Sequence, residues 1–199
     1  MTGSTGSRSR EDIVRAALAC ANEQGWESTS LQAVRLRARV SNGSLFHHFP
    51  NREALAGAVV AAGLSDHQSV LAAELRATTD AHRGVTQVVI RHLQWMQDNR
   101  SLARLFLTTP ATMLRSALDP AAVAENQTFF QDVASWLRKN GWSGSPDLAL
   151  MLALWVGPAQ EYARHGLESA PERLDAAADY LATGAWRALH PLLNDPEDQ

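Results

Sequence analysis

A short stretch near the N-terminus combines small polar side chains with two adjacent histidines. Residues 41–48 read Ser-Asn-Gly-Ser-Leu-Phe-His-His and contain no acid. Short hydrogen-bonding side chains of this kind suit the base edges of a major groove, and a glycine among them permits close backbone approach. Adjacent histidines on a helix point about 100° apart, so joint metal ligation by His47 and His48 is not expected. The stretch favours phosphate or base contact.

The distribution of charge supports this interpretation, although the total charge does not. The 199 residues carry 18 basic and 21 acidic side chains, a net charge of −3. Residues 1–55 hold seven arginines and five acids, which gives +2, whereas the remaining 11 basic and 16 acidic residues give −5. DNA binding needs positive charge on the contacting surface. A small basic head and a larger acidic body are therefore predicted.

Other chemistry has little support in the sequence. The single cysteine, Cys20, excludes an internal disulfide and is expected to fill the core of a protein in the reducing cytoplasm. No nucleophile elbow, phosphate loop, metal-ligand spacing or pair of carboxylates in an apolar context occurs, so we expect neither an enzyme nor a cofactor. The longest apolar run, Leu148–Val156, is too short to span a membrane, and residues 1–10 lack the apolar core of a signal peptide.

Helical spacing of apolar residues recurs along the whole chain and predicts an all-α protein of about nine helices. We expect a disordered tail over residues 1–9 and a helix-turn-helix head over residues 10–55. A helical body for ligand binding and dimerisation is expected over residues 56–193, followed by a second disordered tail over residues 194–199. Asp119-Pro120 and Ser145-Pro146 are predicted to start helices. Pro158 is expected to kink the helix that continues to His165.

Within the head, two short helices must position the polar stretch. Ser30 is predicted to cap the first helix, which ends near Arg37, and Ser41 to cap the second. Leu45 and Phe49, four residues apart, are expected to face inward, and Pro50 ends the second helix. Packed on the preceding helix, such a pair forms a helix-turn-helix unit whose second helix enters the major groove.

The stretch from residue 25 to residue 55 resembles the DNA-binding domain of the TetR family of bacterial transcriptional regulators. The residues that carry the resemblance are Gly25, Trp26, Ser30, Val40, Ser41, Gly43, Ser44, Leu45, Phe46, His48, Phe49, Arg52, Glu53 and Leu55. The resemblance implies a homodimer whose paired heads bind a palindromic DNA operator and are released when a small molecule binds the helical body. A repressor is the usual role in the family, and an activator would have the same head.

Residue types and the resemblance together define an expected set of DNA contacts. It comprises Ser30, Gln32, Arg39, Ser41, Asn42, Gly43, Ser44, Phe46, His47, His48 and Arg52. Four positions depart from the family pattern. Phe46 replaces a tyrosine that reaches a phosphate, and Arg52 replaces a lysine and can still grip a phosphate. Arg39 replaces a glycine, where a left-handed backbone would cost roughly 1 kcal/mol. Arg35 replaces an alanine, must extend outward, and forms a basic cluster with Arg37 and Arg39.

The body is rich in aromatic residues and methionine, which suit either a core or an apolar ligand pocket. The resemblance implies a pocket, for which the candidate residues are His92, Trp95, Met96, Phe106, Met113, Gln127, Phe130, Trp155 and Gln160. The lack of a charged cluster among them favours an apolar or weakly polar effector. The last two helices are expected to form the dimer interface through Leu148, Leu152, Trp155, Ala159, Tyr162, Leu174, Ala178, Leu181 and Ala185. The alternative is a helical ligand carrier that does not bind DNA.

Overall fold

The computed structural model describes residues 3–109, 112, 118, 120–169 and 172–193. Within these residues it contains ten α-helices, one short 3-10 helix and no strand. The all-α fold class is therefore confirmed. Among the described residues, no helix has the length and apolar character needed to cross a membrane. The chain divides into two compact units, and each is described by itself.

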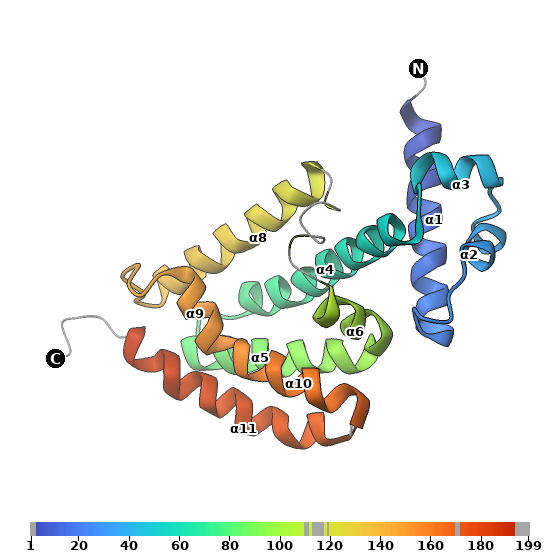
Figure 1. The fold of residues 1–199 in the computed structure, drawn as a ribbon. Coiled ribbons are helices and arrows are strands. Elements are labelled where there is room, and N and C mark those ends of the chain that lie inside the picture. Colours follow the sequence, from blue (N-terminus) through green and yellow to red (C-terminus); the bar gives the residue numbers. More distant parts are fainter. Residues whose placement is uncertain (1–2, 110–111, 113–117, 119, 170–171, 194–199) are drawn as a thin grey trace. The chain divides into compact units, whose positions relative to one another are not determined.

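The first unit comprises residues 1–65 and 99–123. It contains α1 (Gly3–Gln24), α2 (Leu31–Ala38), α3 (Asn42–His48), the first part of α4 (Arg52–Ala77) and α6 (Arg100–Thr108). Figure 1 shows α2 and α3 beside α1, and α1 contacts both of them. The buried side chains of Ile13, Val34, Leu45 and Leu55 join these short helices in one core. Cys20 is buried as expected.

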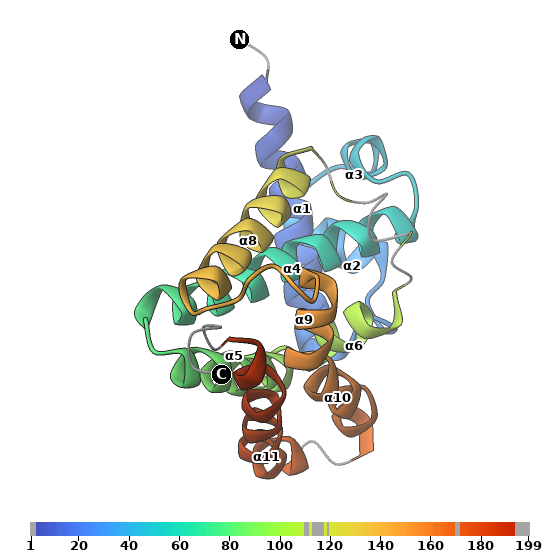
Figure 2. The same cartoon turned by 90° about the vertical axis from the view of Figure 1, so that its left-hand side faces the viewer.

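The second unit comprises residues 66–98 and 124–199. It contains the end of α4, α5 (Ala81–Asp98), most of α8 (Pro120–Lys139), α9 (Leu148–Trp155), α10 (Gly157–Ser169), α11 (Glu172–Leu189) and the 3-10 helix η1 (His190–Leu192). Helix α5 packs against α10 and α11, and Figure 2 shows the three together. The amphipathic pattern of α5 explains its place, because Val85, Val89, Leu93 and Met96 are all buried.

The structure differs from the expected helices in three places. The helix predicted to start at Ser145-Pro146 begins at Leu148, because the Asp147 carboxylate caps it and accepts from the backbone N–H of Leu150 at 2.9 Å. Residues 148–169 form two helices, because the chain leaves the first at Val156 and starts the second at Gly157. Pro158 is then the second residue of a helix, where a missing N–H costs nothing, and ten helices result in place of nine. Helix α1 begins at Gly3, so the tail predicted over residues 1–9 is largely helical in its backbone. The second predicted tail, residues 194–199, lies outside the described residues.

The predicted domain boundary at residue 55 also differs from the division of the structure. Residue 55 lies in the first turn of α4, which continues without interruption to Ala77. The compact units divide at residues 65 and 66 instead, and residues 99–123 group with the head. Helix α4 therefore belongs to both units.

Candidate nucleic-acid interface and ligand pocket

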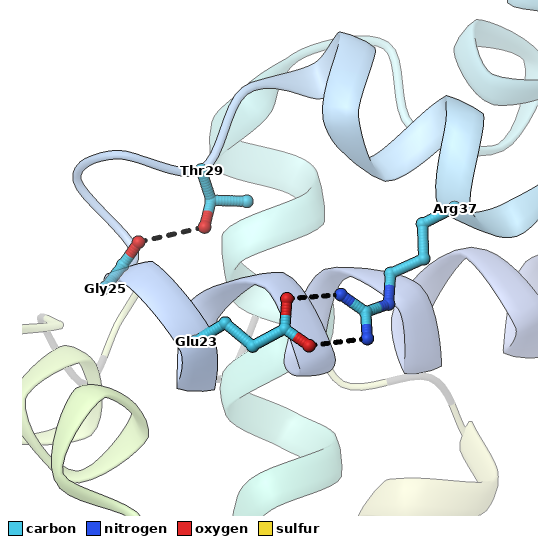
Figure 3. A network of polar contacts seen from close by, with 4 residues as sticks. All are labelled: Glu23, Gly25, Thr29 and Arg37. Atoms are coloured by element: carbon cyan, nitrogen blue, oxygen red, sulfur yellow. Dashed lines mark hydrogen bonds and ion pairs between the residues drawn. The ribbon is translucent and has the colours of Figure 1, made fainter.

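The start of α2 is fixed by two hydroxyl groups. The Ser30 hydroxyl oxygen accepts a hydrogen bond from the backbone N–H of Ala33 at 3.1 Å and caps the helix as predicted. The buried Thr29 hydroxyl donates to the carbonyl of Gly25 at 2.9 Å and fixes the turn before α2 (Figure 3). Because Ser30 uses its oxygen as an acceptor, its O–H remains a donor that could reach a phosphate.

The turn between α2 and α3 contains the left-handed residue expected at Arg39. Arg39 caps the end of α2 with φ of 56° and ψ of 40°, which is left-handed backbone. Its backbone N–H donates to the carbonyl of Leu36 at 3.2 Å, and the N–H of Val40 donates to that of Arg35 at 3.2 Å. The side chain of Arg39 is exposed. The turn thus keeps a cation on the surface at a cost of roughly 1 kcal/mol in backbone strain.

Helix α3 presents the polar face that the sequence predicts. Its N-cap, Ser41, accepts from the backbone N–H of Ser44 at 3.1 Å. Leu45 and Phe49 are 1% and 2% exposed, which confirms that they face inward. The outer face consists of Asn42, Gly43, Phe46 and His47, which are all exposed. Phe46 is half exposed, so its ring is available to a partner.

The N-terminal part of α1 contacts α3, which the sequence did not reveal. The Ser9 and Ser44 hydroxyl oxygens lie 3.2 Å apart. The Arg10 guanidinium lies 5.4 Å from the centre of the Phe49 ring, over its face. The predicted boundary between tail and head falls between Ser9 and Arg10, and neither residue is among the predicted contacts. The cation and the ring are 39 positions apart in the chain, so no local pattern could have linked them.

One member of the predicted arginine cluster is paired within the head. The Arg37 guanidinium donates two hydrogen bonds to the carboxylate of Glu23, at 2.5 and 2.6 Å (Figure 3). The hydrogen bond from Arg37 lowers the pKa of Glu23, and the carboxylate raises the pKa of Arg37. Both groups lie at the surface, where water screens the pair. The charge of Arg37, one of the three arginines of the predicted cluster, is therefore balanced within the head.

Arg52 connects the start of α4 to the turn after α1. Its Nη2 donates to the backbone carbonyl of Trp26 at 2.5 Å and to that of Glu27 at 3.4 Å. The guanidinium also lies 4.9 Å from the centre of the Trp26 ring. A lysine could not both stack on the Trp26 ring and donate to the Trp26 carbonyl, because it lacks a planar guanidinium group. The structure shows this positioning role for Arg52, and the predicted phosphate contact stays a prediction.

The two histidines of α3 differ in environment. Their rings lie 5.2 Å apart and nearly perpendicular, with His47 exposed and His48 half-buried. Burial, together with the nearby charges of His47 and Arg10, lowers the pKa of His48. A neutral His48 can donate from one ring nitrogen and accept at the other. No group of three or more potential metal ligands occurs in the part of the chain that the structure describes.

The head matches a known protein family. Residues 13–59 match the family model described as bacterial regulatory proteins, tetR family. The matched segment begins in α1 and ends in α4, so it contains both short helices and the turn between them. No curated protein is similar enough to the chain to count as a match.

Solved structures with a similar fold cover nearly the whole chain. A TetR family transcription regulator from Marinobacter aquaeolei VT8 has a TM-score of 0.63 and 15% identity over 92% of this chain and 95% of its own. The regulator FadR from Bacillus subtilis, in complex with stearoyl-CoA, has a TM-score of 0.65 and 14% identity over 88% and 96%. NalD, the secondary repressor of the MexAB-OprM multidrug efflux pump in Pseudomonas aeruginosa, has a TM-score of 0.53 and 19% identity over 92% and 95%. At such low identity these likenesses show a TetR-like fold.

Three consecutive residues of α4 form side-chain hydrogen bonds within the second unit. Asp66 accepts from the Trp95 indole N–H at 2.7 Å, and His67 Nε2 lies 2.9 Å from His92 Nδ1. Gln68 donates to Asn126 Oδ1 at 2.7 Å. These bonds tie one turn of α4 to both α5 and α8. His92 is 2% exposed, and its Nε2 has no hydrogen-bond partner among the described residues.

The residues expected to bind an effector do not meet at one described cavity. Trp95, Met96 and Trp155 are buried, whereas Gln127 is exposed and Phe130 and Gln160 are half-buried. Phe106 is half-buried in the first unit, and Met113 lies outside the described residues. The described pocket has a volume of about 450 Å³ and is lined by none of these side chains. It lies at the ends of α4 and α8, which the sequence did not indicate as a site.

Most residues expected at a dimer interface pack inside the second unit. Side chains at five of the nine positions are less than 10% exposed, so they contact helices of their own chain. These residues are Trp155, Ala159, Leu174, Ala178 and Ala185. Leu148, Leu152 and Leu181 are half-buried, and Tyr162 is 38% exposed. The five buried side chains thus belong to the core of one copy, because an apolar helical stripe does not distinguish a core from a dimer contact. A dimer contact through the other four stays a prediction.

Proposed function

We propose that the chain is a transcriptional repressor that binds a palindromic DNA operator as a homodimer and leaves it when a small molecule binds. The observation that carries the proposal is the outer face of α3, where Asn42, Phe46 and His47 are exposed and no acid is present. Helix α3 is the second helix of a TetR-type head, the position from which a recognition helix enters the major groove. NalD, which shares the fold, is described as a repressor, and this supports the choice of role.

Contacts to DNA phosphates would orient helix α3 in the major groove. The exposed Arg39, the free O–H of Ser30 and the backbone N–H groups at the start of α2 suit phosphate oxygens. The net charge of +2 over residues 1–55 is small for one head. Two heads acting together would double the positive charge on one duplex, so dimer formation and steep salt dependence are expected together.

The exposed face of α11 is the proposed dimer surface. Ala176, Tyr180 and Gly184 are four residues apart and share this face, and Tyr180 is 82% exposed. A Cβ placed on Gly184 would meet nothing within 4 Å, so the face is open at that point. Small residues beside one large aromatic ring allow close approach of a second copy. Tyr180→Glu should convert the dimer into a monomer, as measured by light scattering during gel filtration. Asp175→Arg, at an exposed position of the same helix but off this face, should not.

The DNA-binding part of the proposal is tested with duplexes selected from a random pool. An enriched palindrome is expected, with an affinity that falls steeply as salt is raised. Asn42→Ala should weaken binding to that duplex about tenfold, since one base contact contributes about 1–3 kcal/mol. Gln131→Ala, at an exposed position of α8, serves as the control and should leave the affinity unchanged. If no sequence is enriched even at low salt, the repressor proposal fails and a ligand carrier is favoured.

A further inference from the structure

The pocket between the ends of α4 and α8 has a preformed apolar wall. Leu75, Val133 and Trp136 line it, and each is less than 10% exposed. The Trp136 indole N–H donates to the carbonyl of Thr78 at 3.1 Å, and its ring stacks on Trp155 with centres 5.9 Å apart. The six-membered ring of the indole also packs on the backbone at Gly84, where a Cβ would collide with it. The wall is therefore held in place from three sides.

Two cations also line this pocket, and neither has a partner among the described residues. Arg76 comes from the last turn of α4 and Lys139 from the last turn of α8. A cation near a helix C-terminus often serves the free carbonyls there. Here several of those acceptors are already used, because Thr78 accepts from Trp136 and the Trp136 carbonyl accepts from Asn140. The guanidinium and the ammonium group thus remain available to an anion.

The charge and size of the pocket limit what can occupy it. Asp132 is the one acid among the lining residues, so the lining carries a net charge of +1. The neutral polar groups of Thr79, Ser135 and Asn140 lie in the same lining. A volume of about 450 Å³ falls in the range typical of small-molecule sites. The complementary ligand is a small molecule with an apolar body and a single negative charge.

We propose that this pocket binds an amphipathic monocarboxylate, which is the effector that releases the protein from DNA. The carboxylate lies at Arg76 and Lys139, and the apolar body lies on Leu75, Val133 and Trp136. Guanidinium and ammonium groups donate charge-assisted hydrogen bonds to a carboxylate, and a neutral or positive head group forfeits them. The effector role rests on the proposed function, whereas the binding site does not.

Three probes with the same eight-carbon chain separate charge from apolar contact: octanoate, 1-octanol and octylamine. Calorimetric titration of the full chain should show octanoate binding at least about tenfold more tightly than 1-octanol, and octylamine binding most weakly. Arg76→Gln and Lys139→Gln should each lower the affinity for octanoate about tenfold and leave that for 1-octanol within about twofold. Equal affinities for the three probes, no binding of octanoate, or no effect of either substitution would overturn the site.

A matched control and a direct probe are available on α8. Arg138 is the neighbour of Lys139, but its guanidinium lies over the Trp142 ring, 5.2 Å from the centre, and it does not line the pocket. Arg138→Gln should therefore leave octanoate binding unchanged. Lys139 is the only lysine of the chain. Reductive methylation with ¹³C-formaldehyde gives it a single dimethylamine signal, which should move on addition of octanoate and stay in place with 1-octanol.

The effector role needs a separate readout. Octanoate at saturation should reduce the affinity for the selected palindrome at least about tenfold, and Lys139→Gln should require a correspondingly higher concentration. Binding of octanoate without any change in DNA affinity would overturn the effector role. A chain that binds no DNA would refute the proposed function, while the titrations with the three probes would still decide the site.

Discussion

The buried histidine pair of the second unit makes the stability of the fold depend on pH. His67 on α4 and His92 on α5 share one hydrogen bond of 2.9 Å. Burial lowers the pKa of His67 to about 4, although the charge of Asp66 acts in the opposite direction. Burial and the neighbouring His67 lower the pKa of His92 to about 3. Both rings are therefore neutral in the folded chain at pH 5, whereas in the unfolded chain both are protonated.

The sign and size of the effect follow from this difference in proton binding. Between pH 7 and pH 5 the unfolded state gains protons that the folded state does not take up, so the free energy of unfolding falls as the pH is lowered. Since pH 5 lies about 1.5 pH units below the ordinary histidine pKa, each ring contributes a loss of about 2 kcal/mol. The pair together should cost about 4 kcal/mol, a large part of the stability of a domain.

Urea unfolding at pH 7, 6 and 5 and at fixed protein concentration measures this loss. The double variant His67→Leu/His92→Leu removes both titrating groups and leaves neither without its partner, so its stability at pH 7 should be close to that of the unmodified chain. Between pH 7 and pH 5, the free energy of unfolding of the double variant should fall by about 4 kcal/mol less than that of the unmodified chain. His82→Leu, which removes an exposed histidine, is the control and should keep the full loss. The reasoning is refuted if the double variant loses as much stability as the unmodified chain.

Other substitutions test the geometry of the helices. Arg39→Gly should stabilise the head by up to about 1 kcal/mol in urea unfolding, because glycine accepts the left-handed backbone, and should weaken DNA binding in the same preparation. Gly63→Ala should destabilise the chain by about 1–3 kcal/mol, since the new methyl would collide with Leu102. Gly157→Ala meets open space and should be close to neutral, so similar losses for both alanines would contradict the packing. Arg52→Lys should lower the midpoint of thermal unfolding, because lysine cannot both stack on Trp26 and donate to its carbonyl. An unchanged midpoint would contradict the positioning role of Arg52.

Sequence reasoning succeeded where the signal is local. The caps at Ser30 and Ser41 and the left-handed backbone of Arg39 each depend on a few neighbouring residues. The inward positions of Leu45 and Phe49 follow from helical spacing alone. The break at Val156 was only partly foreseen, because Pro158 can either kink a helix or start a new one. Which of these occurs is decided by the packing of α9 and α10, and the sequence does not show it.

The candidate sites were harder to predict because they depend on partners far apart in the chain. Arg37 has the same local context as a free surface cation, and only the fold brings it to Glu23, 14 positions earlier. Arg52 similarly reaches a carbonyl 26 positions earlier. A count of charges treats such residues as available to DNA, although the fold has already engaged them. The head therefore offers DNA fewer free cations than the sequence suggests.

In the body, residues that are inconspicuous in the sequence line the pocket. The aromatic residues of the body are the most conspicuous feature of the sequence, and they favoured an apolar pocket with few charges. Four of its tryptophans, Trp95, Trp136, Trp142 and Trp155, are buried in the core. Arg76 and Lys139, 63 positions apart and each unremarkable at a helix end, line the described pocket together. Apolar side chains buried away from the pocket are not available to a ligand, and the charges at the concave surface determine which head group it accepts. The chemistry of the effector is therefore better inferred from the charges that the fold leaves without partners than from the residues that dominate the composition.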